Sequence, residues 1–270
     1  MALALKNPHE RDAHLRFDEP THTYWIDGSC TGVISVTKFL HCFFSEFDAD
    51  KIIQNMKNSP KWPESKYFGM EDEAIKKQWK DNGAVASKAG TATHLAIENY
   101  LNSTVENSVV LPESSMVTSP EWTYFQQFWA KMSPDLEPYR LEWPVWIAEF
   151  KLAGSIDAVF RRPSDGAFFI YDWKRTKELK MENRFEKGLG PLSHVDDCNY
   201  WHYTLQLNIY AWILEKHYNI PISGLYLVIL HPDNTTYERK RLNRMYDEVN
   251  EMLKARLDAL RQKSRKPVVL

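Results

Sequence analysis

Alternation of hydrophobic and polar residues is clearest in the middle of the chain, where three alternating segments follow one another. They cover residues 140–149, 152–161 and 167–174. A period of two is typical of strands with one buried face, and the Pro-Ser-Asp-Gly sequence before the third segment predicts a turn. We therefore expect an antiparallel meander, with two further strands at 224–231 and 235–241.

Apolar residues at helical spacing occupy much of the remaining sequence. The helices that this spacing predicts cover residues 48–58, 120–132, 200–217 and 243–263. A longer helical segment runs from Glu71 to Asn102. We expect an interruption near Gly83 or Gly90, because glycine weakens a helix.

Turn residues define the other segments. Residues 14–27 alternate around Asp-Glu-Pro-Thr and predict a hairpin, after which Ser35 is the expected N-cap of a short helix to about Cys42. Two prolines in 59–68 predict an exposed loop, and the charged segment 178–198 is expected to be irregular.

Helices before, between and after a small mixed sheet predict an α/β or α+β fold, with the central sheet flanked by helices. The 270-residue sequence contains no internal repeat, no low-complexity tract and no long Gly/Ser linker. We therefore expect a single domain over residues 1–270.

Composition limits the classes of protein that remain. The formal net charge of -2 provides no global basic field, so any phosphate-binding surface must be local. Three widely spaced cysteines, without a CxxC pair, argue against a disulfide framework, a zinc knuckle or an iron–sulfur cluster. No stretch approaches the roughly 18 apolar residues of a membrane span, so we expect a soluble, intracellular protein and no membrane partner.

The strongest chemical signal lies on two neighbouring predicted strands. Gly-Ser-Ile-Asp ends at Asp157, and Asp172-Trp173-Lys174 follows fifteen residues later. Because side chains alternate along a strand, Asp172 and Lys174 should point the same way. Clustered carboxylates need a compensating cation, and hard oxygen ligands favour Mg²⁺ or Mn²⁺. Such an ion polarises a phosphoryl oxygen and lowers the pKa of bound water, and a nearby lysine can orient that water.

Each fragment also has an ordinary interpretation. Asp172 and Lys174 can form a surface ion pair on a solvated strand. His94 and Glu98 share a helix face four residues apart, and Tyr203, Gln206 and Tyr210 share another at spacings of three and four, yet such residues are more often structural. Only the combination favours one catalytic site.

Four motifs in order carry a resemblance to a known family. They are Gly90-Thr91 with His94 and Glu98, then Gly154 to Asp157, Asp172 to Lys174, and Gln206 with Tyr210. This set resembles the RecB-type, YqaJ-like exonuclease branch of the PD-(D/E)XK nucleases over about residues 84–215. The flanking regions are similar to small nucleases of large DNA viruses and to mitochondrial single-strand exonucleases. The resemblance implies a restriction-endonuclease-like core at about 84–241, with elaborations at 1–83 and 243–263.

The same resemblance implies specific roles. His94, Asp157, Asp172 and the backbone carbonyl of Trp173 would surround the metal, and Lys174 would be the catalytic lysine. Gln206 and Tyr210 would support the catalytic set. Glu98 and Glu142 are second-tier candidates, as outer carboxylates or as partners for His94 or Lys174.

DNA is the expected partner, and four basic residues after the catalytic strand are the expected phosphate contacts. They are Arg175, Lys177, Arg184 and Lys187. Interleaved glutamates leave a solvated charged loop as the alternative. The basic segment from Arg256 to Lys266 is expected to be a solvated helix face.

Several functional alternatives stay open. An exonuclease acting on DNA ends or single strands is favoured, because no sequence-reading module is evident. A structure- or sequence-specific endonuclease is the second reading. A catalytically silent nucleic-acid-binding protein and an unrelated carboxylate-metal enzyme are the others. No GxxxxGK[ST] loop is present, so we expect no nucleotide-driven motor in this chain. A role in DNA repair or recombination is an analogy only.

Overall fold

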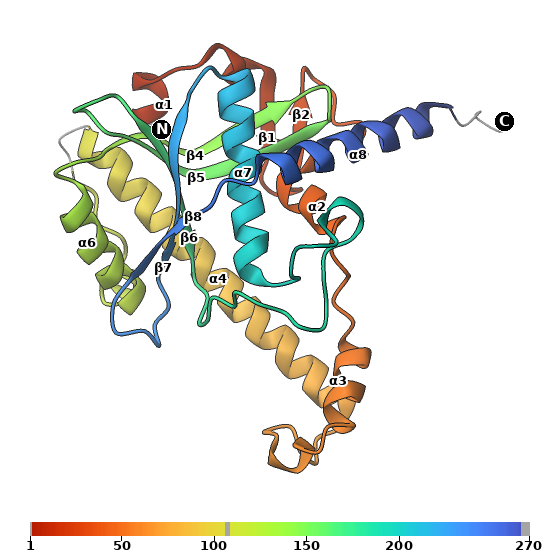
Figure 1. Cartoon of the computed structure of the whole chain (residues 1–270). Coiled ribbons are helices and arrows are strands. Elements are labelled where there is room, and N and C mark those ends of the chain that lie inside the picture. The colour runs from red at the N-terminus through yellow and green to blue at the C-terminus, as the bar shows by residue number, and fades with distance from the viewer. Residues whose placement is uncertain (1, 106–108, 266–270) are drawn as a thin grey trace.

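A six-stranded mixed sheet forms the centre of the protein, which a computed structural model describes over residues 2–105 and 109–265 (Figure 1). Five of its strands lie in the order β3-β5-β6-β7-β8. β3 and β6 pair with different parts of one edge of β5, and β4 pairs with the opposite edge. A separate hairpin is formed by β1 and β2. The strands are β1 (Leu15–Asp18), β2 (Thr23–Ile26), β3 (Ile34–Ser35), β4 (Glu137–Ile147), β5 (Leu152–Arg161), β6 (Phe168–Lys174), β7 (Ile222–Ile229) and β8 (Glu238–Leu242).

Helices flank this sheet and account for the rest of the regular structure. They are α1 (Ala2–Lys6), α2 (Val36–His41), α3 (Ala49–Lys57), α4 (Asp72–Val105), α5 (Ser114–Val117), α6 (Pro120–Met132), α7 (Asn199–His217) and α8 (Tyr246–Arg265). Short 3-10 turns cover Glu10–His14, Trp62–Glu64 and Gly190–Leu192. No helix in the described part of the chain has the length and apolar character needed to cross a membrane.

Two apolar layers separate the helices from the sheet. One layer joins α2, α7 and α8 to the sheet, and the other joins α4 and α6 to its opposite face (Figure 1). Ile170 belongs to the first layer, whereas Tyr171 and Trp173 belong to the second. Strand alternation therefore directs the neighbouring Asp172 and Lys174 toward α7, as the sequence predicts.

The predicted mixed α/β architecture is confirmed, including the antiparallel meander β4-β5-β6. Ser35 caps α2 as expected, since its Oγ accepts the Lys38 N–H at 3.0 Å. The expected interruption of the long helix is wrong, because α4 continues without a break through Gly83 and Gly90. Glycine costs a helix only about 1 kcal/mol, and buried residues near both ends of α4, such as Ile75 and Leu101, anchor it.

The long helix extends well beyond the sheet. Figure 1 shows α4 passing behind the sheet and projecting beyond it, with α3 near its projecting end. Ion pairs from Lys76 to Asp50 at 2.5 Å and from Lys57 to Asp72 connect these two helices. The segment that joins β6 to α7 begins on the same side as this projection. The end of β6 is therefore partly surrounded by other parts of the chain.

Candidate active site

The site forms where β5 and β6 separate. The two strands pair from Arg161 opposite Phe168 up to Ala158 opposite Tyr171, and the pairing stops there. Asp157 and Asp172 are the next residue on each strand. The Asp157 Oδ2 accepts the backbone N–H of Trp173 at 2.9 Å. This contact satisfies a donor that the separation of the strands would leave unpaired.

Lys174 and Asp172 form an ion pair beside this gap. The Lys174 Nζ lies 2.7 Å from Oδ2 of Asp172 and 5.0 Å from the ring centre of Tyr203 on α7. Side-chain exposure is 5% for Asp172 and 19% for Lys174, so the pair is largely buried. An ordinary surface ion pair does not describe this arrangement.

His94 reaches the same gap from α4. Its Nε2 donates to the carbonyl oxygen of Trp173 at 3.0 Å. Its Nδ1 lies 3.4 Å from Oε1 of Glu142 and 3.6 Å from Oδ2 of Asp157. His94 therefore contacts three strands, through Glu142 on β4, Asp157 on β5 and the Trp173 carbonyl on β6. His94 and Trp173 are 79 residues apart in the sequence.

Glu142 occupies a central place in this cluster. It lies on β4 between two residues that pair with Ala158 and Ile156, and so faces the Asp157 position. Its φ of 39° is unusual for a residue other than glycine, and such strain is often found at functional sites. The Glu142 Oε2 accepts a hydrogen bond from Ser155 Oγ at 3.3 Å. We interpret this strained backbone as a device that holds the carboxylate next to His94.

Negative charge exceeds positive charge in this cluster. Burial and the neighbouring Asp157 raise the pKa of Asp172 to about 7, although Lys174 opposes that shift. Burial also raises the pKa of Asp157. Burial alone would lower the pKa of His94, but Asp157 and Glu142 outweigh it and raise the value to about 9. Two cations thus face three carboxylates, and repulsion between the carboxylates remains.

Comparison with known proteins identifies the family. The family model of the PD-(D/E)XK nuclease superfamily matches residues 66–267, and this range includes every residue of the cluster. The chain belongs to the PD-(D/E)XK nuclease superfamily. The resemblance drawn from the sequence is confirmed at this level, and the RecB-type, YqaJ-like branch stays a prediction.

Solved structures add only distant similarity. One, titled "Crystal structure of SSO0001", is 15% identical with a TM-score of 0.35, and the match covers 84% of this chain and 76% of that one. A "Putative exonuclease" from Eubacterium rectale is 10% identical with a TM-score of 0.37, and the match covers 65% and 66%. No curated protein matches the nuclease sequence.

The residues in the nuclease site fit a divalent metal ion. One ligand atom from each of His94, Glu142 and Asp157 lies within 4.8 Å of the others. Asp172 adds a buried Oδ2 that accepts no hydrogen bond of good geometry, despite the nearby ammonium. The Trp173 carbonyl is a further oxygen donor beside His94. Because imidazole binds a metal only when neutral, His94 would lose a proton on binding.

Two further predicted site residues, Gln206 and Tyr210, lie on α7. The Gln206 Nε2 donates to Thr37 Oγ1 of α2 at 3.2 Å. Tyr210 is buried, which raises its phenol pKa well above the ordinary value. A Cβ at Gly154 would lie 2.7 Å from the Tyr210 Oη, so this position has no space for a side chain. Tyr210 thus lies against the strand that carries Asp157, and the supporting roles of Gln206 and Tyr210 stay predictions.

Glu98 is less closely connected to the site. It lies one turn after His94 on α4, and burial together with Glu142 raises its pKa. No hydrogen bond or ion pair of Glu98 occurs within the described ranges. Its role as an outer carboxylate stays a prediction.

The four basic candidates for DNA contact differ in their environment. Arg175 donates to Glu121 at 2.8 Å, in a pair that is mostly buried. The other three are exposed. Lys177 pairs with Asp233 and Lys187 pairs with Asp196, whereas Arg184 forms no ion pair within residues 2–105 and 109–265. Exposed ion pairs are weak, so Lys177 and Lys187 can leave their carboxylates and bind a phosphate instead. Arg175 cannot do this at low cost in free energy, because it would leave the buried Glu121 without a partner.

The C-terminal basic segment only partly fits its expected solvated face. Arg256 donates to the carbonyl oxygens of Phe150 and Gly32 at 3.0 and 2.9 Å, so it fixes α8 to the body. Arg261 lies 3.9 Å from Asp258 and is exposed. Lys266 lies outside the described residues.

Sequence reasoning missed several contacts of the nuclease site. Glu142 was only a second-tier candidate, and its unusual backbone conformation leaves no sequence signal. The contacts of Thr37 and Glu121 were not predicted, because their partners lie 169 and 54 residues away. Tyr203 was expected on the same helix face as Gln206 and Tyr210, but its contact with Lys174 was not predicted.

Proposed function

We propose that this nuclease is a DNA exonuclease, which hydrolyses phosphodiester bonds at DNA ends or in single strands with Mg²⁺ or Mn²⁺. The observation that carries the proposal is the partly buried group of three carboxylates, one histidine and one lysine where β5 and β6 separate. We further propose that residues 1–270 form one nuclease domain with its core at about 84–241.

Each residue has a part in the proposed reaction. His94, Glu142, Asp157, Asp172 and the Trp173 carbonyl would hold the ion. When bound, a divalent ion supplies Lewis-acid stabilisation of phosphoryl charge and lowers the pKa of water. Asp172 and Asp157 raise the pKa of Lys174 despite its burial, so its Nζ keeps its proton. Lys174 would therefore act as a hydrogen-bond donor and a positive charge for the phosphate, and not as a base.

Two observations favour an exonuclease over an endonuclease. The RecB-type resemblance favours an exonuclease, and no sequence-reading module is evident in the chain. An endonuclease that acts on a particular structure or sequence is the second candidate. A catalytically silent binding protein is disfavoured, because binding alone does not require the buried pair of Asp172 and Lys174.

A single set of digests tests the proposal. End-labelled linear and circular single-stranded DNA are incubated with wild type, Asp172→Ala and Lys174→Ala, in Mg²⁺, Mn²⁺ or EDTA. We expect linear DNA to shorten only with metal and wild-type protein, while circles survive. Asp165→Asn is the matched control, since this exposed carboxylate lies in the turn at the other end of β5 and β6. Cut circles would support an endonuclease, and DNA that is bound but never cut would support the silent protein.

A further inference from the structure

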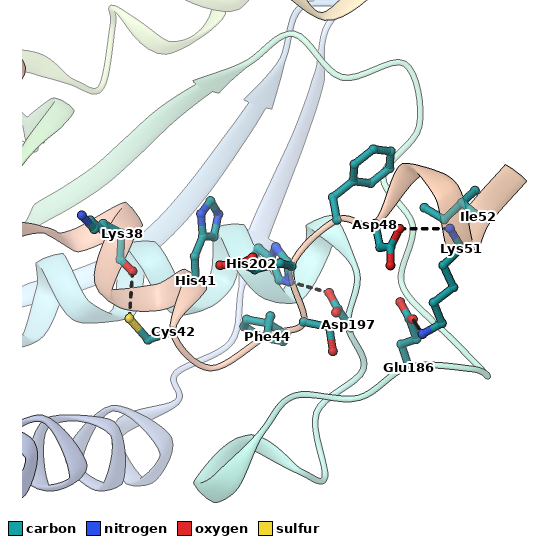
Figure 2. A pocket seen from close by; sticks show the side chains of 13 residues that line it. Lys38, His41, Cys42, Phe44, Asp48, Lys51, Ile52, Glu186, Asp197 and His202 are labelled. Atoms are coloured by element: carbon teal, nitrogen blue, oxygen red, sulfur yellow. Dashed lines mark hydrogen bonds and ion pairs between the residues drawn. The ribbon is translucent and has the colours of Figure 1, made fainter. Parts of the chain in front are cut away.

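A large pocket lies beside the site, between the end of α2 and the start of α7. Its volume is about 610 Å³, within the usual range for ligand pockets. Figure 2 shows His41 and Phe44 on one side of it, with His202 close to Phe44 and Glu186 across the opening. The rings of Phe44 and His202 are 4.0 Å apart. The segments around residues 43–48 and 186–197 thus enclose a space with aromatic rings in its wall.

The charges around the pocket disfavour an anion. Four carboxylates and two lysines line it, namely Glu46, Asp48, Glu186, Asp197, Lys38 and Lys51. The balance is negative when the histidines are neutral, so a phosphate group would be repelled from the interior. A flat, uncharged group that stacks on aromatic rings and donates hydrogen bonds to carboxylates fits better. The nucleobases have this chemistry.

Helix α7 links the pocket, which His202 lines, to the candidate active site. His202, Gln206 and Tyr210 are four residues apart and lie on one helix face, at about 6 Å per step. Gln206 contacts Thr37, and His41 follows Thr37 by one turn of α2. Tyr203, next to His202, packs on Lys174. Because stacked nucleotides advance about 3.4 Å each, the pocket lies within a few nucleotides of the reacting phosphate.

We propose that this pocket binds an unpaired nucleobase of the substrate strand, one or two nucleotides from the bond that is cut. The inference deepens the proposed function and rests on it for the position of the bond. An unpaired base that turns out of its stack can lie against the His202 ring in the pocket wall. Exposed Phe47, at the rim, adds a second aromatic surface.

Abasic substitution combined with two protein variants tests the proposal. Single-stranded oligonucleotides carry one abasic site at successive positions from each end, and the dissociation constants are measured in EDTA by fluorescence anisotropy. We expect one or two positions near an end to raise the constant about tenfold, the size of one base–aromatic stack. In the double variant His41→Ala/Phe47→Ala this penalty should fall below about twofold. Both side chains are exposed, so the variant should fold, which its melting curve checks.

Phe185→Ala provides the matched comparison, because Phe185 is 95% exposed and does not line the pocket. It should keep the full abasic penalty. If Phe185→Ala removes the penalty, or if no position shows one, the base does not use the pocket and the inference is overturned. Digests of the same strands with metal report separately on the proposed function. An abasic penalty without cleavage would support base binding in the pocket and contradict the nuclease activity. Cleavage without an abasic penalty would support the nuclease activity and contradict base binding in the pocket.

Discussion

The repulsion between the buried carboxylates can be measured as stability. Asp172 is 3% exposed, and its pKa is raised from 3.8 to about 7. A shift of that size corresponds to about 4 kcal/mol. Because the folded pKa is the higher one, the folded state is favoured while the group is protonated. The free energy of unfolding therefore falls as pH rises from about 4 to 7, and the loss is complete above that range.

Asp172→Asn should therefore raise the melting temperature of the metal-free protein. In EDTA at pH 8 we expect a gain of about 1–4 kcal/mol, or roughly 2–16 °C, since 1 kcal/mol shifts a chain of this size by about 2–4 °C. The gain should shrink at pH 5. Mg²⁺ or Mn²⁺ at 1,000 times its dissociation constant should cancel or reverse this difference, because the bound ion then adds about 4.1 kcal/mol to the wild type alone.

Thermal unfolding by circular dichroism, with and without metal, measures all of these differences. Asp165→Asn is the control, since this exposed carboxylate pairs with Arg162, which lowers its pKa to about 2. Its melting temperature should not rise at pH 8. A metal-free Asp172→Asn protein that melts below the wild type at pH 8 would refute the reasoning, because the carboxylate would then be stabilising.

Three further substitutions test other parts of the structure. Lys174→Ala should lower kcat about 10²- to 10³-fold in digests while DNA affinity is kept, and an equal loss of affinity would contradict the catalytic role. Arg175→Ala leaves the buried Glu121 without its partner, so urea unfolding should show a loss of about 3–5 kcal/mol; a change below 1 kcal/mol would show that the pair is not buried. Gly154→Ala should cost about 1–3 kcal/mol through its clash with a phenol oxygen, whereas Gly83→Ala, with open space around it, should stabilise α4 by about 0.5–1 kcal/mol. Equal effects of the two glycine changes would reject the packing argument.

Local patterns were sufficient for most of the fold. The helix Pro120–Met132 begins after the N-cap Ser119 and matches its predicted range, because capping and amphipathic spacing are encoded within a few residues. The strands β5 and β6 are likewise close to their predicted ranges. The continuity of α4 through Gly90 was not predicted, because contacts at its two ends decide it.

The candidate site was predicted unevenly. His94, Asp157, Asp172 and Lys174 were named in advance, and the structure brings them together. The central position of Glu142 was not foreseen, since it depends on a left-handed backbone residue in β4.

The sequence by itself determined which residues could do chemistry, because residue type and a spacing of two on a strand fix which side chains share a face. Only the tertiary structure decided where β5 and β6 separate, which makes room for charged groups between them. It also decided that Arg175 turns inward to Glu121, and that α2 and α7 leave a pocket beside the site. These features depend on contacts between distant segments, which a local pattern does not contain.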